Sequence, residues 1–498
     1  MKELPPNTPV IVGIGFEQET SEDPAQCAEP WQLMVRAVRL AAADAGSEAL
    51  LAQIESISVP QGMWEYGNPG RLIADALGCP SARSILSDLG VLQLSLLSDL
   101  CRSITAGEQQ VGVITGGEAK FRELRAGITG RPVVNTEQPE GTPPPDVHHT
   151  SSDPWASDLE ARAGLSSPVE LFAIIESALR YQQGLDVEDH RDRIAQLYSR
   201  FSEVAAGNPR AWRREPVSPR AVRDPSPRNA MLAFPYTKRH SSQWNVNQAV
   251  AILVCSAARA AQLGLERDGW IFPLAAAQSK HVVPLAQQRR LHTHPGTVLS
   301  GDRALRLAGI SARDVDAGEL YSCFPAAIQS FALDLKLPET CPWTVTGAMP
   351  FAGGPYNSFS LAGVARMVEV LRGGEGNDGS ERRIGLVSNL SGIFGKQACA
   401  LFSNLPNADG YRYEDVTAEV AACDLPLPLD GDYVGPATIV GYTVVFVGGV
   451  PSHAIAICDT PEGRRTVVRS EDQALLESMT REEFCGRVVH VAGAAFGP

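Results

Sequence analysis

The sequence predicts an α/β protein made of two similar layered halves, with an insertion in the first half and a small β-rich domain after the second. Three observations predict this organisation. Short apolar strands alternate with amphipathic helices through most of the chain, which is typical of a layered α/β core. The order helix, Gly-rich break, short strand and Gly-containing turn occurs at 91–117 and again at 358–392, which indicates an internal duplication. After about residue 404 the pattern changes to short strands separated by prolines.

The first half begins with an apolar, β-branched run from Pro9 to Gly15, which predicts a buried strand. Helical spacing of apolar residues predicts a helix from Trp31 to Ala45, which ends at the following glycine. The other elements expected in this half are a strand at 54–60, a long helix at 91–106, a strand at 111–115 and a buried strand at 249–256.

Residues from about 120 to 230 interrupt the alternation of strands and helices. The stretch from Arg131 to Pro154 is rich in Pro, Thr and Asp, which predicts a surface loop. Helices are expected at 169–183 and 187–205, and an Arg- and Pro-rich stretch follows at 210–228. The segment is therefore interpreted as a mostly helical insertion.

The same patterns predict the helices and strands of the second half and of the C-terminal region. The second half is expected to contain a helix at 303–308, a strand that turns into a helix at 319–321, a helix at 358–371 and a strand at 384–388. In the C-terminal region, strands are expected at 438–447, 454–458, 464–468 and 487–491, with a short helix at 473–478. Short strands with frequent turns in about 90 residues favour an OB-like barrel.

The longest strand of the C-terminal region is apolar on both faces. One face would carry Thr438, Val440, Tyr442, Val444 and Phe446, and the other Ile439, Gly441, Thr443 and Val445. We expect one face inside the barrel and the other against the core. The predicted domains are an N-terminal half at 1–118 and 231–260, an inserted loop domain at 119–230, a C-terminal half at 261–405 and the β-rich domain at 410–498.

Composition excludes several classes of protein. The 498 residues carry 43 Lys and Arg against 57 Asp and Glu, for a net charge of −14, which disfavours a nucleic-acid partner. No stretch approaches ~20 uninterrupted apolar residues, so no membrane span is expected. The ten cysteines form no CxxC pair, which argues against a structural zinc site. The first residues lack the basic start and long apolar run of a secretory signal, so a cytoplasmic protein with reduced thiols is expected.

Common motifs are incomplete or absent. The Gly13-x-Gly15 pair lacks the third glycine of a dinucleotide fingerprint, and no Gly-x-Ser-x-Gly elbow of a hydrolase is present. The pairs His148-His149 and His292-x-His294 lie in polar or Pro-containing stretches without a carboxylate cluster. We interpret them as surface histidines, and no metal site is predicted.

Four segments place glycines and polar residues at the edges of strands or helices, where α/β proteins present their sites. They are 243–256 (QWNVNQAVAILVCS), 319–329 (ELYSCFPAAIQ), 344–359 (TVTGAMPFAGGPYNSF) and 385–396 (GLVSNLSGIFGK). On these segments the chain resembles the thiolase superfamily, and more closely the thiolase-like proteins type 1 among the relatives of sterol-carrier-type thiolases. The resemblance covers about residues 5 to 405, and the β-rich region resembles the additional C-terminal domain of that group.

The resemblance implies a duplicated thiolase fold, with two halves packed as a five-layer αβαβα core and a loop domain inserted in the first half. It also implies acyl exchange between CoA thioesters through an activated Cys, a His base, a second Cys and an oxyanion hole. The family's nucleophile turn falls at Gly90, whereas Cys101 lies inside the following helix, where we expect a packed core thiol. Gly353-Gly354-Pro355 stands where the family has Gly-His-Pro, and Asn389 lies near the position of the second Cys.

The segment Tyr321-Ser322-Cys323-Phe324 stands where the sterol-carrier type has His-Asp-Cys-Phe. Tyr321 is either a general acid or a tyrosine whose hydroxyl caps a buried hydrogen bond, and Cys323 is either a reactive thiol or a structural one. His240 replaces an Asn before a family strand, so it is expected to face the cleft. The candidate catalytic residues are Tyr321, Cys323 and His240. The candidate substrate-binding residues are Gly90, Gly353, Gly354, Pro355, Asn357, Asn389 and Gly392.

The resemblance implies a cytoplasmic, thiolase-like protein that acts on or binds acyl-CoA esters in lipid metabolism, an acyltransferase by class but without the classical Cys and His. Coenzyme A would enter as part of the substrate, with no separate cofactor, and the protein would be a monomer or a homodimer. Two alternatives stay open: a thiolase-fold aldolase that uses tyrosines, and a non-catalytic acyl-CoA-binding protein. Converging hydroxyls of Tyr321 and Tyr356 would favour the aldolase.

Overall fold

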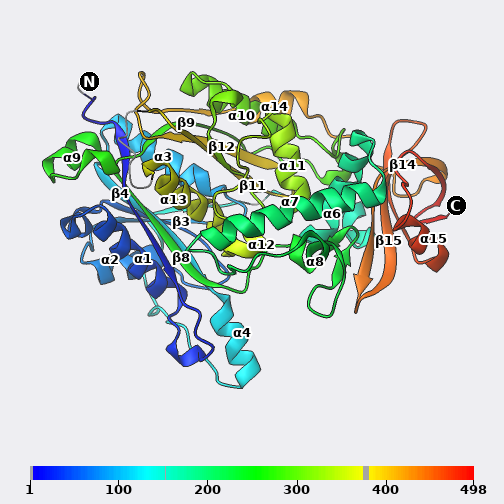
Figure 1. Ribbon diagram of the computed structural model, residues 1–498, viewed down its shortest axis with the longest axis horizontal. Helices are drawn as coiled ribbons and strands as arrows, with labels where there is room; N and C mark the ends of the chain where they lie inside the picture. Colours follow the sequence, from blue (N-terminus) through cyan, green and yellow to red (C-terminus); the bar gives the residue numbers. More distant parts are fainter. Residues whose placement is uncertain (1–3, 152, 374–380, 498) are drawn as a thin grey trace.

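The computed structural model describes residues 4–151, 153–373 and 381–497. Two mixed sheets, with helices between and outside them, form the larger part of the molecule (Figure 1). A β-barrel formed by the C-terminal region lies at the other end of the molecule from the first sheet, and the long helices α6 and α7 run from the sheets toward this barrel (Figure 1).

The first sheet has the strand order β1-β8-β4-β2-β3-β5. Its outer face is covered by α1 (Pro30–Asp44) and α2 (Pro69–Leu77). Helix α1 begins at a capping box formed by Glu29 and Gln32, with proline at the first helical position. The strands are β1 (Pro9–Gln18), β2 (Ser56–Pro60), β3 (Arg83–Ser87), β4 (Val111–Ala119), β5 (Val147–His149) and β8 (Asn247–Ser256).

The second sheet has the order β10-β11-β12-β9-β13. Helix α10 (Pro295–Ala308) packs on its strands β9 and β12, and α11 (Pro325–Asp334) packs against α10. The strands are β9 (Phe272–Ser279), β10 (Ala317–Glu319), β11 (Ile384–Ser391), β12 (Lys396–Ser403) and β13 (Arg412–Asp415). The remaining short helices of the two halves are α9 (Ala257–Gln262), α12 (Met349–Ala352) and α14 (Thr417–Cys423).

The two sheets repeat one arrangement, because β1-β8-β4-β2 in the first corresponds to β9-β12-β11-β10 in the second. Helices α3 (Gln93–Ala106) and α13 (Phe359–Arg372) contact strands of both sheets and so form the middle layer. The predicted duplication and the five-layer αβαβα core are therefore confirmed. Helix α3 begins two residues later than predicted, because Gly90 has φ +93° and Val91 closes a turn with Asp88.

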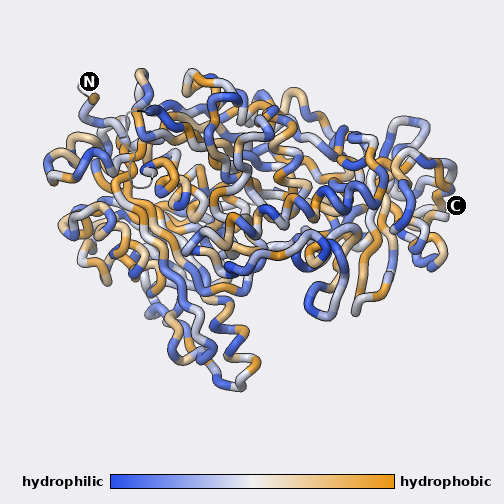
Figure 2. Tube along the Cα trace, in the orientation of Figure 1, coloured by the Kyte–Doolittle hydropathy of each residue, from blue (hydrophilic) through white to orange (hydrophobic). Residues whose placement is uncertain are grey.

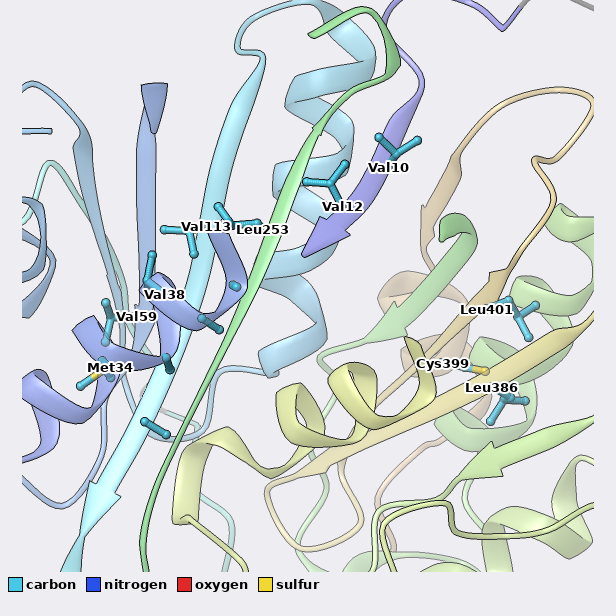
Figure 3. Packing of buried hydrophobic residues seen from close by; sticks show 14 of the residues in the cluster. Val10, Val12, Met34, Val38, Val59, Val113, Leu253, Leu386, Cys399 and Leu401 are labelled. Atoms are coloured by element: carbon cyan, nitrogen blue, oxygen red, sulfur yellow. The ribbon is translucent and has the colours of Figure 1, made fainter. Parts of the chain in front are cut away.

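Strands β4 and β8 are buried at every position, as expected for strands covered by helices on both faces. Figure 3 shows Val113 of β4 and Leu253 of β8 beside Val38 of α1. The same strands form a continuous apolar band in Figure 2. Burial of this continuous apolar surface is the main favourable term that holds the layers together.

The segment 119–230 is mostly helical, as predicted, but its residues 147–149 form β5 at the edge of the first sheet and so belong to the core. It contains α4 (Lys120–Thr129), α5 (Asp158–Ala163), α6 (Pro168–Gln183), α7 (Val187–Gly207) and α8 (Pro219–Arg223). After it, β6 (Met231–Ala233) and β7 (Tyr236–Thr237) extend the sheet of the barrel through β14, although we predicted 231–260 as part of the N-terminal half. The pairing with β14 forms over a long sequence separation, which local patterns do not reveal.

The C-terminal region forms a closed five-stranded β-barrel in the order β14-β15-β16-β18-β17-β14. Helix α15 (Gln473–Met479) lies between β16 and β17 in the sequence, which are the third and fourth strands in chain order. Residues 412–415 lie within the predicted 410–498 domain, yet they pair as β13 with β9 of the second sheet. The barrel strands are β14 (Val434–Val447), β15 (Val450–Asp459), β16 (Arg465–Ser470), β17 (Val488–Ala492) and β18 (Ala495–Gly497).

Strand β14 is buried on both faces, but the alternation predicted for it is wrong. Because of a register shift between Ile439 and Gly441, the side chains of both Ile439 and Tyr442 point into the barrel core. Val445 faces outward and belongs to the same apolar cluster as Ile174 of α6. Gly441 permits the close approach of α6, because a Cβ there would lie 2.8 Å from Ile174 Cγ2. The outer face therefore packs chiefly on the insertion, which in turn contacts α11 of the second half.

In the part of the chain that the structure describes, no helix is both long enough and apolar enough to cross a membrane.

Candidate functional site

A cavity of about 550 Å³ lies where loops of both halves meet the insertion. Its walls come from the turn before α3, the segments after β10 and before α13, the β11–β12 turn, and Ser151 with residues 153–172 of the insertion. A cavity of this size suits a small-molecule ligand. The lining residues are Leu89, Gly90, Ser151, Asp153, Trp155, Ser166, Pro168, Phe172, Val282, Tyr321, Cys323, Phe324, Tyr356, Asn357, Leu390, Ser391, Gly392, Ile393 and Lys396.

Five of the candidate residues line this cavity: Gly90, Tyr321, Cys323, Asn357 and Gly392. They come from four segments that are far apart in sequence. Three of the four segments that carry the family resemblance, 319–329, 344–359 and 385–396, therefore meet at one cavity, whereas 243–256 contributes no lining residue. The turn before α3 forms another part of the wall.

Tyr321 and Cys323 lie on the segment that follows β10. The backbone N–H of Tyr321 donates to Ser388 Oγ at 2.8 Å, which fixes this segment against β11. Burial raises the pKa of the Tyr321 hydroxyl and of the Cys323 thiol well above their ordinary values. The nearby Cys323 and Tyr356 raise the pKa of Tyr321 further. Both groups are therefore protonated at neutral pH.

His240 is placed differently from the sequence-based expectation. Its side chain is 1% exposed, its ring lies between those of Tyr198 and Tyr236, and it is absent from the cavity lining. Its Nδ1 accepts the backbone N–H of Thr237 at 3.2 Å and caps the short helical turn Lys238–His240. Burial lowers the pKa of His240 to about 3, so the ring is neutral and structural in this position.

The other candidate residues are used within the fold. Gly353, with φ +99°, leaves room for Gln248, whose Oε1 would lie 2.3 Å from a Cβ. The Gly354 N–H donates to the Gln243 carbonyl at 2.8 Å, and Pro355 precedes the turn Tyr356–Ser358. Asn389 is buried, and its Oδ1 accepts the N–H of Leu94 in the first turn of α3 at 3.1 Å. None of these candidate residues lines the cavity.

Backbone strain is concentrated at the cavity. Among the described residues, five non-glycine residues have positive φ, and three of them lie in the two turns that line it: Tyr356 at +41°, Ile393 at +44° and Phe394 at +69°. Each such residue costs about 1–3 kcal/mol, so the surrounding packing must enforce it. Strain of this kind is typical of ligand sites.

Lys396 closes one side of the cavity, and its importance was not apparent from the sequence. Its Nζ lies 2.7 Å from Asp153 Oδ2 and 2.6 Å from Ser151 Oγ, and it donates to the Gly90 carbonyl at 3.2 Å. Asp153 and Ser151 lie about 245 positions away from Lys396, in the insertion. No local pattern could have predicted the ion pair of Lys396 with Asp153. Because the two charges cancel, the pair leaves the cavity wall without net charge.

The apolar wall rests on a buried polar network that the sequence analysis also missed. Phe172 stacks on Phe324 with ring centroids 5.0 Å apart, and Tyr236 stacks on the same ring at 5.5 Å. Behind them, the fully buried Glu176 accepts hydrogen bonds from His190, Tyr236 and Gln329. Although burial opposes it, these hydrogen bonds hold the pKa of Glu176 below its ordinary value.

The predicted surface histidines differ from one another. His148 is accessible and pairs with Asp88 at 2.6 Å. His294 is only 1% exposed, and its Nδ1 accepts the N–H of Gly296 and caps α10. Its interpretation as a surface residue was wrong. Among the described residues, no group of three or more His, Cys, Asp or Glu side chains is placed to hold a metal ion.

Comparison with known proteins agrees with this architecture. No family model matches the chain. A stretch of 281 residues, 52% of the chain, is 25% identical to the acetyl-CoA acetyltransferase of Methanothermobacter thermautotrophicus and covers 68% of that protein.

Solved structures match over a larger share of the chain. A monomeric SCP2-thiolase-like protein type 1 from Mycobacterium smegmatis is similar over 99% of this chain and 100% of that one, with a TM-score of 0.80 and 24% identity. The chain has the thiolase fold. The Ltp2–ChsH2(DUF35) aldolase matches 79% of this chain and 98% of that one, with a TM-score of 0.57 and 18% identity. The Acat5 thiolase from Ascaris suum, in complex with coenzyme A, matches 80% of this chain and 100% of that one, with a TM-score of 0.55 and 16% identity.

Proposed function

We propose that the protein binds acyl-CoA thioesters in this cavity, as part of lipid metabolism, and that it transfers no acyl group through a cysteine. The observation that carries the proposal is the composition of the cavity wall. Cys323 is the one thiol among the described lining residues, its pKa is raised by burial, and no histidine is among them. A neutral thiol without a base is a poor nucleophile, so binding is supported better than the acyltransferase chemistry of the relatives.

The shape and lining of the cavity support an acyl thioester as the ligand. Trp155, Phe172 and Phe324 provide an apolar surface for an acyl chain, and Tyr321, Asn357 and Ser391 offer polar groups beside it. Coenzyme A is part of this ligand, and no separate cofactor is proposed. The coenzyme A complex of a thiolase with the same fold supports this choice of ligand class.

A second function, that of a carbon–carbon lyase, is favoured by one observation. Tyr321 and Tyr356 line the same cavity, and the proximity of Tyr356 contributes to the raised pKa of Tyr321. A neutral tyrosine suits the step in which an enolate, formed when a β-hydroxyacyl thioester is split, takes up a proton. The aldolase with the same fold makes this alternative concrete.

We further propose that the barrel is of the OB type and that the protein is a cytoplasmic monomer. The barrel's strand order, with a helix between the third and fourth strands, supports the first assignment. The monomeric state of the Mycobacterium smegmatis protein supports the second, as does β5, which covers the edge of β3.

The test is a thermal-shift screen of the protein against acyl-CoA esters of increasing chain length, with free coenzyme A as reference. A ligand at about 100 times its Kd stabilises the folded state by about 2.7 kcal/mol. Ser166→Trp, which places bulk in the cavity, should abolish the shift, whereas Ser81→Trp, at an exposed position that does not line the cavity, should preserve it. No shift with any ester would contradict the proposal. Release of a carbonyl product from β-hydroxyacyl-CoA that depends on Tyr321 would favour the lyase instead.

A further inference from the structure

Asn357 offers a hydrogen-bond donor that the protein itself does not use. The residue lines the cavity and is only 8% exposed. Its Nδ2 is buried and has no hydrogen-bond partner among the described residues. A buried amide donor without a partner costs about 1–3 kcal/mol, so a native protein normally satisfies it. Because Asn357 forms part of the cavity wall, an occupant of the cavity can provide the acceptor.

The orientation of this amide is set by a chain of hydrogen bonds that begins at a helix terminus. Ser360 lies in the first turn of α13, where backbone N–H groups have no partner within the helix. Its N–H donates to Gln93 Oε1 at 2.9 Å. Gln93 must therefore present its Nε2 on the other side, and this group donates to Asn357 Oδ1 at 3.1 Å. Because Oδ1 already accepts a hydrogen bond, the unused NH₂ group is the donor that Asn357 offers a ligand.

The backbone holds Asn357 in place. It has φ −92° and ψ 26° and follows Tyr356, whose φ is +41°. Gln93 is 3% exposed and comes from the first position of α3, so a rigid helix of the middle layer supports the amide. A site built on such supports loses little conformational entropy when a ligand binds.

The charges around the cavity define the chemistry of the acceptor. Asp153 and Lys396 are the charged residues among those that line it, and they pair with each other at 2.7 Å. The remaining polar lining groups are uncharged at neutral pH. Beside Asn357 the wall therefore suits an uncharged acceptor attached to an apolar group better than a carboxylate.

We infer that Asn357 Nδ2–H donates a hydrogen bond to the carbonyl oxygen of the bound ligand, and that Gln93 is the positioning residue that points this donor at the carbonyl. The inference rests on the proposed function, because the thioester supplies that carbonyl. To that function it adds Asn357 as the donor to the carbonyl oxygen and Gln93 as the residue that orients the Asn357 amide.

The test compares ligands that differ only in the carbonyl. Calorimetry measures the affinity of butyryl-CoA against S-butyl-CoA, a thioether with a methylene in place of the carbonyl. A second pair, S-butyryl- and S-butyl-N-acetylcysteamine, carries the same difference without the nucleotide. One neutral hydrogen bond should make the thioester bind about 2- to 12-fold more tightly than the thioether.

Asn357→Asp keeps the shape of the side chain but replaces the donor by an acceptor, and should abolish the preference for the thioester over the thioether. Gln93→Leu should reduce the preference, because the Asn357 amide is then free to rotate. Gln473→Leu, the same substitution on the barrel helix α15, should keep it. A wild-type protein that binds thioester and thioether equally in both pairs would overturn the inference. A preference seen only with the cysteamine pair would uphold the carbonyl site and overturn the coenzyme A proposal.

Discussion

Arg180 is predicted to hold the barrel on the insertion, and its removal tests how the barrel and the insertion are coupled. The residue lies near the end of α6, is 1% exposed, and reaches into the barrel. Its Nε lies 2.8 Å from Glu483 Oε2, and its NH2 group lies 3.0 Å from Glu483 Oε1 and 2.8 Å from the Tyr442 hydroxyl. Replacement by Met keeps the apolar stem but leaves the Glu483 carboxylate without its partner.

The magnitude follows from the burial of the two partners. Breaking a fully buried ion pair costs about 3–5 kcal/mol. The Glu483 side chain is 24% exposed and can regain some water, and Tyr442 keeps its own hydrogen bond to the Glu482 carbonyl. We therefore expect Arg180→Met to lower the free energy of local unfolding by about 2–4 kcal/mol.

Amide hydrogen exchange resolved by peptide is the suitable assay, because it reports the stability of each region separately. Exchange in α6 and in strand β14 should become about 30- to 900-fold faster, whereas β4 and β8 should be unaffected. Adding Glu483→Gln removes the unpaired charge and should restore at least half of the protection. Unchanged exchange in β14, or a double variant no better than Arg180→Met alone, would refute this account of the barrel contact.

Three further predictions follow from the same structure. Gly441→Ala should weaken the barrel contact by about 1–3 kcal/mol through overpacking, because the new Cβ meets Ile174, and hydrogen exchange in α6 measures it; unchanged exchange would contradict the close approach. The folded-state pKa of His240, about 3, lies below the unfolded value, so its contribution to stability is present above about pH 6.5 and is lost as the pH falls. The stability advantage of wild type over His240→Asn in urea unfolding should therefore shrink by about 2 kcal/mol from pH 7 to pH 5. A stability difference that stays the same at both pH values would refute the conclusion that the His240 ring is buried in its neutral form. Alkylation of the native protein should label the exposed Cys423 first and spare the fully buried Cys101, whereas early labelling or an acyl adduct at Cys101 would contradict its role as a core thiol.

Local patterns predicted the elements whose neighbours cover them on both faces. The apolar runs of β1, β4 and β8 and the helical spacing of α1, α3 and α13 specify buried strands and amphipathic helices with little dependence on long-range context. Strand β18 was missed because its three residues are too short to show a period. The alternation in β14 was wrong because a bulge near Val440 leaves no mark in hydropathy.

The candidate site was predicted only as far as the family segments reach. Tyr321, Cys323, Asn357 and Gly392 lie on those segments and do line the cavity. The ion pair of Lys396 with Asp153 and the hydrogen bond of Gln93 to Asn357 join positions more than 200 residues apart. His240 was placed in the cleft because its sequence position suggested it, but the rings of Tyr198 and Tyr236 enclose it.

The most direct test of the central claim is native mass spectrometry of the protein mixed with butyryl-CoA, followed by denaturation of the same sample. We expect a complex with one molecule of butyryl-CoA that is lost completely on denaturation, because the cavity binds the ester and Cys323, the thiol among the described lining residues, stays protonated. A protein that forms no complex, or one that keeps the mass of a butyryl group after denaturation, would contradict it.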